Sequence, residues 1–248
     1  MSAGRTAVLG ATRGLGRALA RRLAERGDQL VVLGRDPDDL ARTAEDLSQR
    51  SGGRPVGLAP CDLLDADSIA PALLRAETLM DGLDTVVVTA GVFATQEELE
   101  HDADATEQLL LVDLVRTIRF CEEARRRLLA RGGGTLCVFS SVAGEKARRS
   151  MVLYGAAKAG LTRYLEGLDL RHADDGLHVV TVKPGFAHTS MTEGLEPPPF
   201  AAEADEIAEA VVAGLDRGRR VIYAPSIWRW ILAVVRRLPR GVMRRAEF

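Results

Sequence analysis

The chain has 248 residues, of which 46% are hydrophobic and 27% are charged, and its formal net charge is −2. This composition is typical of a globular protein with one core, and the small net charge argues against nucleic acid as a partner. Three scattered cysteines without ligand-like spacings argue against a disulfide framework and a metal site. With no signal-peptide pattern and no apolar run of about 20 residues, we expect a cytoplasmic protein.

Apolar runs rich in β-branched residues alternate along the chain with segments of helical periodicity. The expected strands are residues 6–10, 29–34, 85–91, 134–140, 178–185 and 220–225, with a weaker candidate at 55–60. Helical periodicity marks the segment after the first strand and the long stretch 102–131. Continuous apolar strands alternating with helices indicate a parallel sheet covered on both faces, the α/β class. No linker divides residues 1–225, which we expect to form one domain.

A glycine-rich turn, "VLGATRGLGRALA", joins the first expected strand to a helix. Gly10 permits a tight turn, while Gly14 and Gly16 let the backbone approach a dinucleotide pyrophosphate at the helix N-terminus. The spacing is G-x-x-x-G-x-G rather than the commoner G-x-G-x-x-G. A connector without any ligand is the alternative.

The second expected strand ends in "GRD", where dinucleotide folds contact the adenosine ribose. Arg35 stands there and Arg13 lies within the glycine turn, so two guanidinium groups converge on one corner. Planar guanidinium forks match the oxygens of a 2′-phosphate, which favours NADP(H) over NAD(H). The alternative is that Arg35 is a surface charge paired with Asp36.

The stretch "YGAAKAG" places Tyr154 and Lys158 four residues apart, on one face of a helix. The chain has only three lysines and three tyrosines. A nearby ammonium favours the phenolate and would bring the pKa of the tyrosine closer to neutrality, as general acid–base chemistry requires. Ser141 ends the preceding strand, where its hydroxyl could bind a substrate oxygen.

These segments resemble the short-chain dehydrogenase/reductase superfamily over nearly the whole chain. The matching motifs are "GATRGLG", "GRD", "CDL" (61–63), "TAG" (89–91), "SSVAG" (140–144), "YGAAK" and "KPGFAHT" (183–189). The resemblance implies a single Rossmann-like, doubly wound domain with seven parallel strands. It also implies that Ser141 orients the substrate, that Tyr154 donates or accepts the proton, and that Lys158 lowers the tyrosine pKa and holds the nicotinamide ribose.

The resemblance further implies which residues contact the cofactor. Besides Tyr154 and Lys158, they are Gly10, Thr12, Arg13, Gly14, Leu15, Gly16, Arg35, Asp62, Leu63, Ala90, Gly91, Pro184, Gly185, Ala187 and Thr189. Two positions depart from the family pattern. Asp113 replaces the usual asparagine of the proton relay, and Val88–Thr89 replaces an Asn-Asn pair. An unpaired buried carboxylate would be costly, so the role of Asp113 in the relay is open.

Three features bear on the substrate. Lys146, Arg148 and Arg149 are expected on the rim of the site, where they would suit an anionic substrate, or else form a solvated loop. The loop 187–201 is expected to close over the substrate. The tail 226–248 is basic and amphipathic, with nine arginines and no acidic residue between 217 and 245.

A helix in the tail would carry Trp228, Ile231, Leu232 and Val235 on one face, beside arginines. This pattern indicates peripheral contact with the inner face of a membrane, or packing against the domain or a partner subunit. The tail and rim together resemble the keto-reductase subunit of decaprenylphosphoryl-ribose 2-epimerisation, which implies a 2-keto sugar on a polyprenyl phosphate.

The sequence therefore predicts an NADPH-dependent reductase that transfers hydride to the ketone of a small molecule, with an anionic or lipid-linked compound as a candidate substrate. The alternatives are a reductase of 3-oxoacyl or other small ketones, a non-catalytic dinucleotide-binding regulator, and a membrane-docked scaffold. The family resemblance suggests a homodimer or homotetramer formed through the helices that contain Asp113 and Tyr154.

Overall fold

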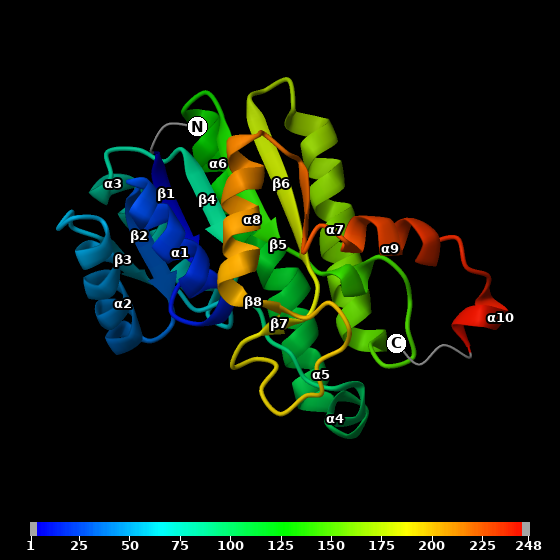
Figure 1. Ribbon diagram of the computed structural model, residues 1–248. Coiled ribbons are helices and arrows are strands. Elements are labelled where there is room, and N and C mark those ends of the chain that lie inside the picture. The colour runs from blue at the N-terminus through cyan, green and yellow to red at the C-terminus, as the bar shows by residue number, and fades with distance from the viewer. Residues whose placement is uncertain (1–3, 245–248) are drawn as a thin grey trace.

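The computed structural model describes residues 4–244 and contains a seven-stranded parallel sheet (Figure 1). The strands are β1 (Arg5–Leu9), β2 (Gln29–Gly34), β3 (Gly57–Pro60), β4 (Thr85–Val88), β5 (Gly134–Phe139), β6 (Leu177–Pro184) and β9 (Val221–Ala224). Their order across the sheet is β3-β2-β1-β4-β5-β6-β9, so the chain crosses over after β3 and winds in the other direction. All seven expected strands and the Rossmann-like doubly wound fold are confirmed. The largest difference is that β4 ends at Val88, because residues 89–91 leave the sheet to line a cleft.

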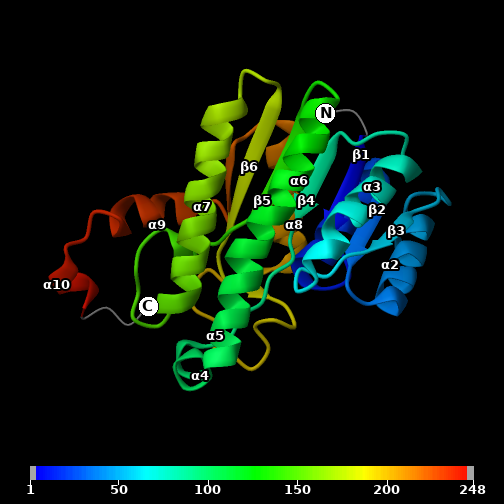
Figure 2. The ribbon, with the colours of Figure 1, turned by 180° about the vertical axis from the view of Figure 1, so that it is seen from behind.

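Helices cover both faces of the sheet. One face carries α1 (Gly14–Arg26), α2 (Pro37–Arg50) and α8 (Ala204–Asp216). The other carries α3 (Ile69–Leu79), α6 (Thr117–Ala130) and α7 (Val152–His172), with α6 and α7 side by side in Figure 2.

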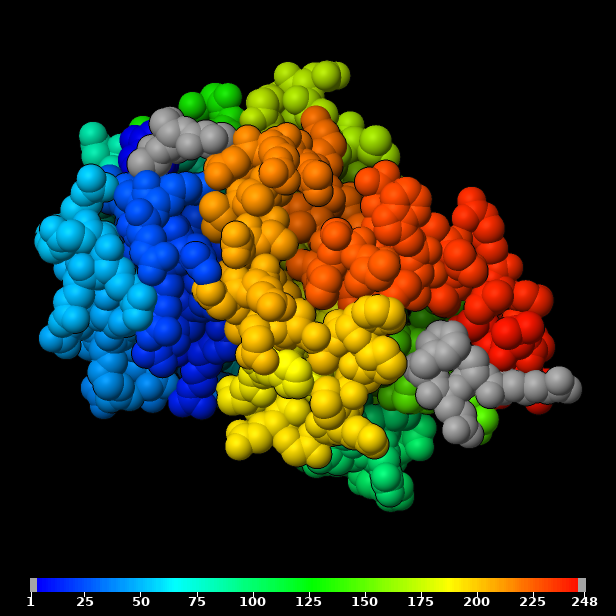
Figure 3. Space-filling model, in the orientation of Figure 1, coloured from blue at the N-terminus to red at the C-terminus, as the bar shows by residue number. Residues whose placement is uncertain are grey.

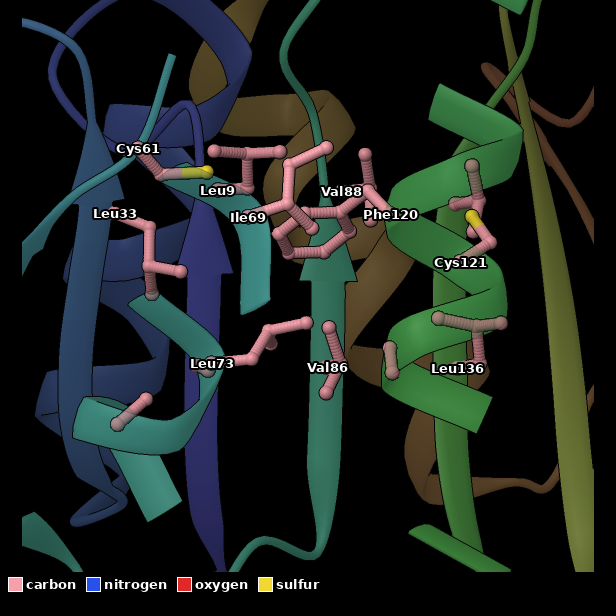
Figure 4. Packing of buried hydrophobic residues seen from close by; sticks show 14 of the residues in the cluster. Leu9, Leu33, Cys61, Ile69, Leu73, Val86, Val88, Phe120, Cys121 and Leu136 are labelled. Carbon is pink, nitrogen blue, oxygen red and sulfur yellow. The ribbon is translucent and has the colours of Figure 1, made fainter. Parts of the chain in front are cut away.

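Successive strand residues point to opposite faces of the sheet, so each strand contributes to two cores. Val8 packs beneath α1, whereas Leu9 packs with the cluster under α3 and α6. Figure 4 shows this second cluster, in which Phe120 lies between Ile69 and Val88. Burial on both faces explains why the strands are apolar throughout instead of alternating with polar residues.

The stretch 102–131 is not one continuous helix. A short helix α4 (Gln96–His101) precedes α5 (Ala103–Leu110), and a π-helical segment η2 (Leu111–Arg116) then leads into α6. Within this wider turn, the Thr117 hydroxyl donates to the carbonyl of Val112, five residues earlier, at 2.8 Å. Single π-turns inside α-helices are frequent at functional sites, and this one carries Asp113.

The loop 187–201 is closed at its base by a small two-stranded sheet. Its strands are β7 (Ala187–His188) and β8 (Ala202–Glu203), which pair in parallel. The Thr192 hydroxyl donates to the carbonyl of Thr189 at 3.1 Å and accepts from its N–H at 3.2 Å, which fixes the start of the loop. Two short helical turns, η1 (Ala66–Ser68) and η3 (Val142–Gly144), complete the main body.

The tail contains two short helices, α9 (Trp228–Val235) and α10 (Arg240–Met243), which project from one side of the molecule in Figure 3. The face of α9 expected to be apolar is the face that packs inward: Leu232 is buried and Trp228 lines the cleft. Trp230 and Val234 lie on the other side, 66% and 63% exposed. The sequence left open whether this face contacts a membrane or the domain, because periodicity alone does not distinguish lipid from protein as the covering surface. For Trp228 and Leu232 the structure shows packing against the domain.

Within residues 4–244, no helix combines the length and the apolar character needed to cross a membrane. The three cysteines, Cys61, Cys121 and Cys137, are free and buried.

Candidate active site

A cleft of about 610 Å³ opens at the carboxyl ends of the parallel strands. Open α/β sheets bind ligands at this edge, where the order of the strands reverses. Every residue predicted to be catalytic or to bind cofactor lines this one cleft, from the glycine turn to α7. The structure brings together Gly10, Thr12, Arg13, Gly14, Leu15, Gly16, Arg35, Asp62, Leu63, Ala90, Gly91, Asp113, Ser141, Tyr154, Lys158, Pro184, Gly185, Ala187 and Thr189. The contacts of each with a cofactor or substrate stay predictions.

The backbone of the glycine turn is packed closely, both within the turn and against the segment that follows β4. Gly10 has φ +89°, and a Cβ there would lie 2.6 Å from the backbone nitrogen of Ala90. A Cβ at Gly16 would lie 2.0 Å from the carbonyl oxygen of Gly10, so this glycine is needed for the helix to pack on the turn. The Thr89 hydroxyl, in the place of a family asparagine, donates to the carbonyl of Leu9 at 2.8 Å and ties β4 to β1.

Arg35 and Arg13 have different surroundings in the cleft. Asp36 caps α2, and its Oδ1 accepts the N–H groups of Asp38 and Asp39, each at 2.9 Å. Arg35 is exposed and has no ion pair within residues 4–244, so the alternative of a pair with Asp36 is not observed. The Arg13 guanidinium pairs with Asp39 at 2.9 Å. The residues present thus fit a 2′-phosphate, with Arg35 as the uncommitted cation.

Helix α7 carries both Tyr154 and Lys158 into the cleft. The Lys158 Nζ lies 5.5 Å from the centroid of the Tyr154 ring, and Phe93 packs edge-on against that ring at 5.2 Å. Close packing places the helix: a Cβ at Gly144 would lie 2.7 Å from the backbone nitrogen of Ala159. The predicted juxtaposition of phenol and ammonium is therefore present.

Asp113 forms a buried ion pair with Lys158. The Asp113 Oδ2 and the Lys158 Nζ are 3.0 Å apart, with side-chain exposures of 0% and 6%. Because Oδ2 lacks hydrogen-bond alignment, this contact is chiefly one of charge. The other oxygen, Oδ1, accepts the N–H of Val92 at 2.8 Å. Gly91 leaves room for this contact, since a Cβ there would lie 3.0 Å from Oδ1. The carboxylate is paired, so the cost expected for an unpaired buried charge does not arise.

The electrostatics around the phenol differ from the sequence prediction. Burial raises the pKa of Tyr154 above its ordinary value, and the Asp113 carboxylate raises it further. Lys158 and a hydrogen bond with Ser141 lower the pKa of Tyr154 but do not outweigh the rise. The prediction of a lowered pKa considered the ammonium but not the burial of the phenol or the nearby carboxylate, and it is wrong for the protein without cofactor. A tyrosine with a raised pKa holds its proton at neutral pH, as a proton donor must.

The two serines of "SSVAG" have different surroundings. Ser140 is buried, and its hydroxyl donates to the carbonyl of Lys158 at 3.0 Å and contacts the Thr162 hydroxyl at 2.6 Å. Ser141 lines the cleft, and its Oγ accepts the N–H of Ala143 at 3.1 Å. Ser140 thus holds β5 against α7, while Ser141 keeps its hydroxyl beside Tyr154.

Only one of the three cations predicted for the rim lines the cleft. Lys146 donates to the carbonyls of Arg236 and Leu238, both at 3.2 Å, so it binds the tail. Arg149 donates to the carbonyl of Arg244 at 3.4 Å. The prediction is therefore wrong for Lys146 and Arg149, because these side chains bind backbone carbonyls of the tail instead. Arg148 alone lies in the cleft.

Several lining residues escaped the sequence reasoning. They are mostly apolar and include Phe93, Met151, Met191, Leu195, Pro198 and Trp228. Trp228 reaches the cleft from α9, and its ring packs edge-on against Phe200 of the loop 187–201 at 6.4 Å. In Figure 3 this loop and α9 form adjacent parts of one face. The only signals for these residues were their place in the loop 187–201, their place beside a motif or, for Trp228, the apolar face of the tail helix.

Comparison with known proteins places this cleft in a family. The sequence pattern described as short chain dehydrogenase matches residues 5–199. An uncharacterized oxidoreductase of Mycobacterium tuberculosis is 33% identical over 239 residues, which cover 96% of this chain and 95% of the relative. An uncharacterized oxidoreductase of Staphylococcus aureus is 28% identical, covering 86% of this chain and 91% of the relative.

Solved structures agree with this assignment. A short-chain dehydrogenase from Sphingobium yanoikuyae, in complex with NADPH, superposes with a TM-score of 0.81 at 26% identity, covering 99% of this chain and 96% of the other. A short-chain type dehydrogenase/reductase from Mycobacterium ulcerans has the same fold, with a TM-score of 0.78 at 22% identity, covering 90% and 88%. The chain therefore belongs to the short-chain dehydrogenase/reductase family of oxidoreductases.

Proposed function

We propose that the protein is an NADPH-dependent reductase of ketones in which Tyr154 donates the proton. The observation that carries this proposal is the convergence of Ser141, Tyr154 and Lys158 in one cleft, with the Lys158 Nζ 5.5 Å from the tyrosine ring. NADPH, when bound, supplies the hydride that reduces the carbonyl carbon.

The residues of the chain supply the remaining chemistry. The Ser141 hydroxyl donates to the substrate oxygen and orients the carbonyl. The Tyr154 hydroxyl gives that oxygen its proton as negative charge develops on it. Lys158 stabilises the phenolate left behind, and Asp113 holds the ammonium in place at 3.0 Å. The raised pKa of Tyr154 supports reduction as the working direction, because the phenol enters the reaction protonated.

The proposal is tested by NADPH consumption over a broad panel of ketones. Tyr154→Phe removes the proton donor and should lower turnover about 10²- to 10⁴-fold. Tyr223→Phe is the matched control, since its ring lies 5.6 Å from the Nζ of another lysine, Lys183, but does not line the cleft. Equal turnover by Tyr154→Phe and the parent would refute the mechanism. If NADPH binds but the parent reduces no ketone, the non-catalytic regulator becomes the better assignment.

The preference for NADPH rests on Arg35, together with the NADPH bound by the relative from Sphingobium yanoikuyae. Arg35→Ala should weaken NADPH binding about 10- to 100-fold, the value of a lost charge-assisted hydrogen bond, and leave NADH binding nearly unchanged. Isothermal titration with both nucleotides measures the difference. Equal losses for the two would refute the contact with a 2′-phosphate.

Two classes of ketone suit the cleft: a 2-keto sugar linked to a polyprenyl phosphate, and a 3-oxoacyl chain. Both carry an apolar chain, which adjoins the carbonyl in the second class and lies beyond the phosphate in the first, and the apolar lining supports both. The basic tail supports the lipid-linked candidate more directly, through contact with an anionic membrane. We assign that contact to the exposed Trp230 and Val234 rather than to Trp228. Trp230→Ser should reduce co-sedimentation with anionic vesicles; unchanged co-sedimentation would refute the contact.

We propose that the chain assembles as a homodimer or homotetramer through the face formed by α6 and α7. The two helices lie side by side in Figure 2, and exposed apolar residues of this region include Val115 of η2, just before α6, and Leu170 of α7, which are 54% and 79% exposed. Light scattering of the parent and of Leu170→Glu measures the assembly. A monomeric parent would refute the proposal.

A further inference from the structure

The cleft contains four cationic side chains, and only two of them have an acidic partner within residues 4–244. Arg13 pairs with Asp39 at 2.9 Å and Lys158 pairs with Asp113 at 3.0 Å. The side chains of Arg35 and Arg148 have no hydrogen bond or ion pair in that part of the chain. Arg35 is accounted for by the proposed 2′-phosphate contact. Arg148 has no role in the mechanism.

The position of Arg148 separates it from the region predicted to hold the cofactor phosphates. It lies in the segment 145–151, between η3 and the start of α7, which Figures 1 and 2 both show beside α9. The glycine turn and Arg35 lie at the ends of β1 and β2, toward the other edge of the sheet. Ser141 and Tyr154 flank the segment in sequence. Arg148 therefore belongs to the substrate end of the cleft.

The neighbouring arginine and lysine show that the loop itself does not need Arg148. Lys146 and Arg149 bind carbonyls of the tail and so fasten the segment. Arg148 is half-buried without making such a contact. Burial lowers the pKa of the Arg148 guanidinium, which reflects lost hydration without a compensating anion. An arginine still keeps its charge in a protein, so its desolvation is offset only when an anion arrives.

Among residues 4–244, no acidic residue that lines the cleft is free to serve as that anion. Asp113 is committed to Lys158 and Val92, and Asp62, a predicted cofactor contact, accepts the N–H of Leu64 at 2.9 Å. The cleft residues from the loop 187–201, from α9 and from the segments next to Tyr154 are largely apolar. They include Phe93, Val142, Met151, Met191, Leu195 and Trp228.

We propose that Arg148 is the anion-binding residue of the substrate site, and that the substrate is an amphipathic ketone with a carboxylate or phosphate group. This inference rests on the proposed function, since it names the class of ketone that the same site accepts. The guanidinium fork binds two oxygens of the anionic group, and the apolar lining holds the rest of the chain. Arg148 thus sets specificity, while Ser141 and Tyr154 act on the carbonyl.

The test measures binding, without turnover, to protein saturated with NADP⁺. The probes are octanoate, octyl phosphate and 1-octanol, which share a chain and differ in their polar group. The parent should bind one or both anions at least about tenfold more tightly than the alcohol, as a charge-assisted contact predicts. A preference for octanoate indicates a carboxylate substrate, and a preference for octyl phosphate indicates a phosphate.

Variants at adjacent positions separate a specific contact from general attraction. Arg148→Met should lower the affinity for the anions about tenfold and leave the affinities for 1-octanol and NADP⁺ unchanged. Arg148→Lys should retain part of the affinity for the anions. Arg149→Met removes a neighbouring charge outside the cleft and should leave all the affinities unchanged. Equal losses in Arg148→Met and Arg149→Met would overturn the proposal. So would equal binding of the alcohol and both anions, or binding of none of the three.

Failure of this inference is distinct from failure of the proposed function. Tyr154→Phe should abolish reduction but keep the preference for the anion, because the phenol is not its partner. If Tyr154→Phe loses the preference for the anions over 1-octanol and Arg148→Met keeps it, the anion binds at the catalytic end of the cleft. That result would overturn the role of Arg148. If the parent prefers the anions but reduces no ketone, the proposed anion site stands and the proposed reductase function is refuted.

Discussion

The molecule contains two clusters of similar composition, each with a tyrosine, a lysine and a carboxylate. In the cleft, the Lys158 Nζ lies 5.5 Å from the Tyr154 ring and pairs with Asp113. In the second cluster, the Lys183 Nζ lies 5.6 Å from the Tyr223 ring and pairs with Glu145. All four charged side chains are at most 9% exposed.

What distinguishes the clusters is the remaining partner of each carboxylate. Asp113 binds the N–H of Val92 and stays within the cleft, whereas Glu145 also pairs with Arg236 of the tail at 3.0 Å. The first cluster therefore surrounds the proposed proton donor, and the second fastens the tail to the body. Burial raises the pKa of both tyrosines. The same three residue types therefore do not by themselves define a candidate active site. Only the first cluster lines the cleft and has a neighbouring serine, Ser141.

The largest expected effect comes from removing each lysine. Lys158→Met leaves Asp113 buried without a cation and should cost about 3–5 kcal/mol in the free energy of unfolding. Lys183→Met should cost less, because the half-exposed Arg236 still pairs with Glu145. Reduction per folded molecule should fall about 10²- to 10⁴-fold in Lys158→Met only. Denaturant unfolding and NADPH consumption measure the two quantities. A comparable catalytic loss in Lys183→Met would remove the functional distinction between the clusters.

A smaller effect should follow from neutralising each carboxylate. Asp113 raises the pKa of Tyr154, so Asp113→Asn should lower that pKa. Reduction requires the protonated phenol and declines as the pH rises through its pKa, so the alkaline limb of the rate profile should move to lower pH. The profile of kcat/KM against pH measures this shift.

Glu145→Gln is the matched control for the pH profile. Glu145 raises the pKa of Tyr223, which does not line the cleft, so this substitution should leave the alkaline limb in place. An alkaline limb that stays in place in Asp113→Asn would show that another group controls it. A displaced limb in Glu145→Gln would mean that the second cluster reaches the reaction through the tail.

The sequence was sufficient to predict the fold and the motif residues that line the cleft. The strands are apolar because both faces are covered, and this local pattern is visible without long-range information. The glycine turn, Ser141 and the Tyr154–Lys158 spacing are likewise local patterns, each contained in one segment. Their convergence follows from the topology, because parallel strands end at one edge of the sheet.

The sequence could not show which charges pair across segments. Asp113 and Lys158 are 45 positions apart, and neither their pairing nor the burial of Tyr154, which is the main cause of its raised pKa, is visible in a local pattern. Lys146 and Arg149 have the same character as Arg148 in the sequence, and only the folded tail separates them. Trp228 and Trp230 are two positions apart and point to different surroundings, which depends on how α9 packs.

The smallest expected effect concerns Arg236, the outer member of the second cluster. Its side chain is 49% exposed, so water screens its pair with Glu145, and Lys183 remains to compensate the carboxylate. Arg236→Met should therefore cost at most about 1 kcal/mol and lower Tm by no more than about 4 °C. Thermal unfolding beside Lys183→Met measures the contrast. A loss of unfolding free energy as large as that of Lys183→Met would mean that Arg236 of the tail, rather than the buried lysine, provides the main stabilisation of Glu145. The second cluster would then depend on its exposed partner.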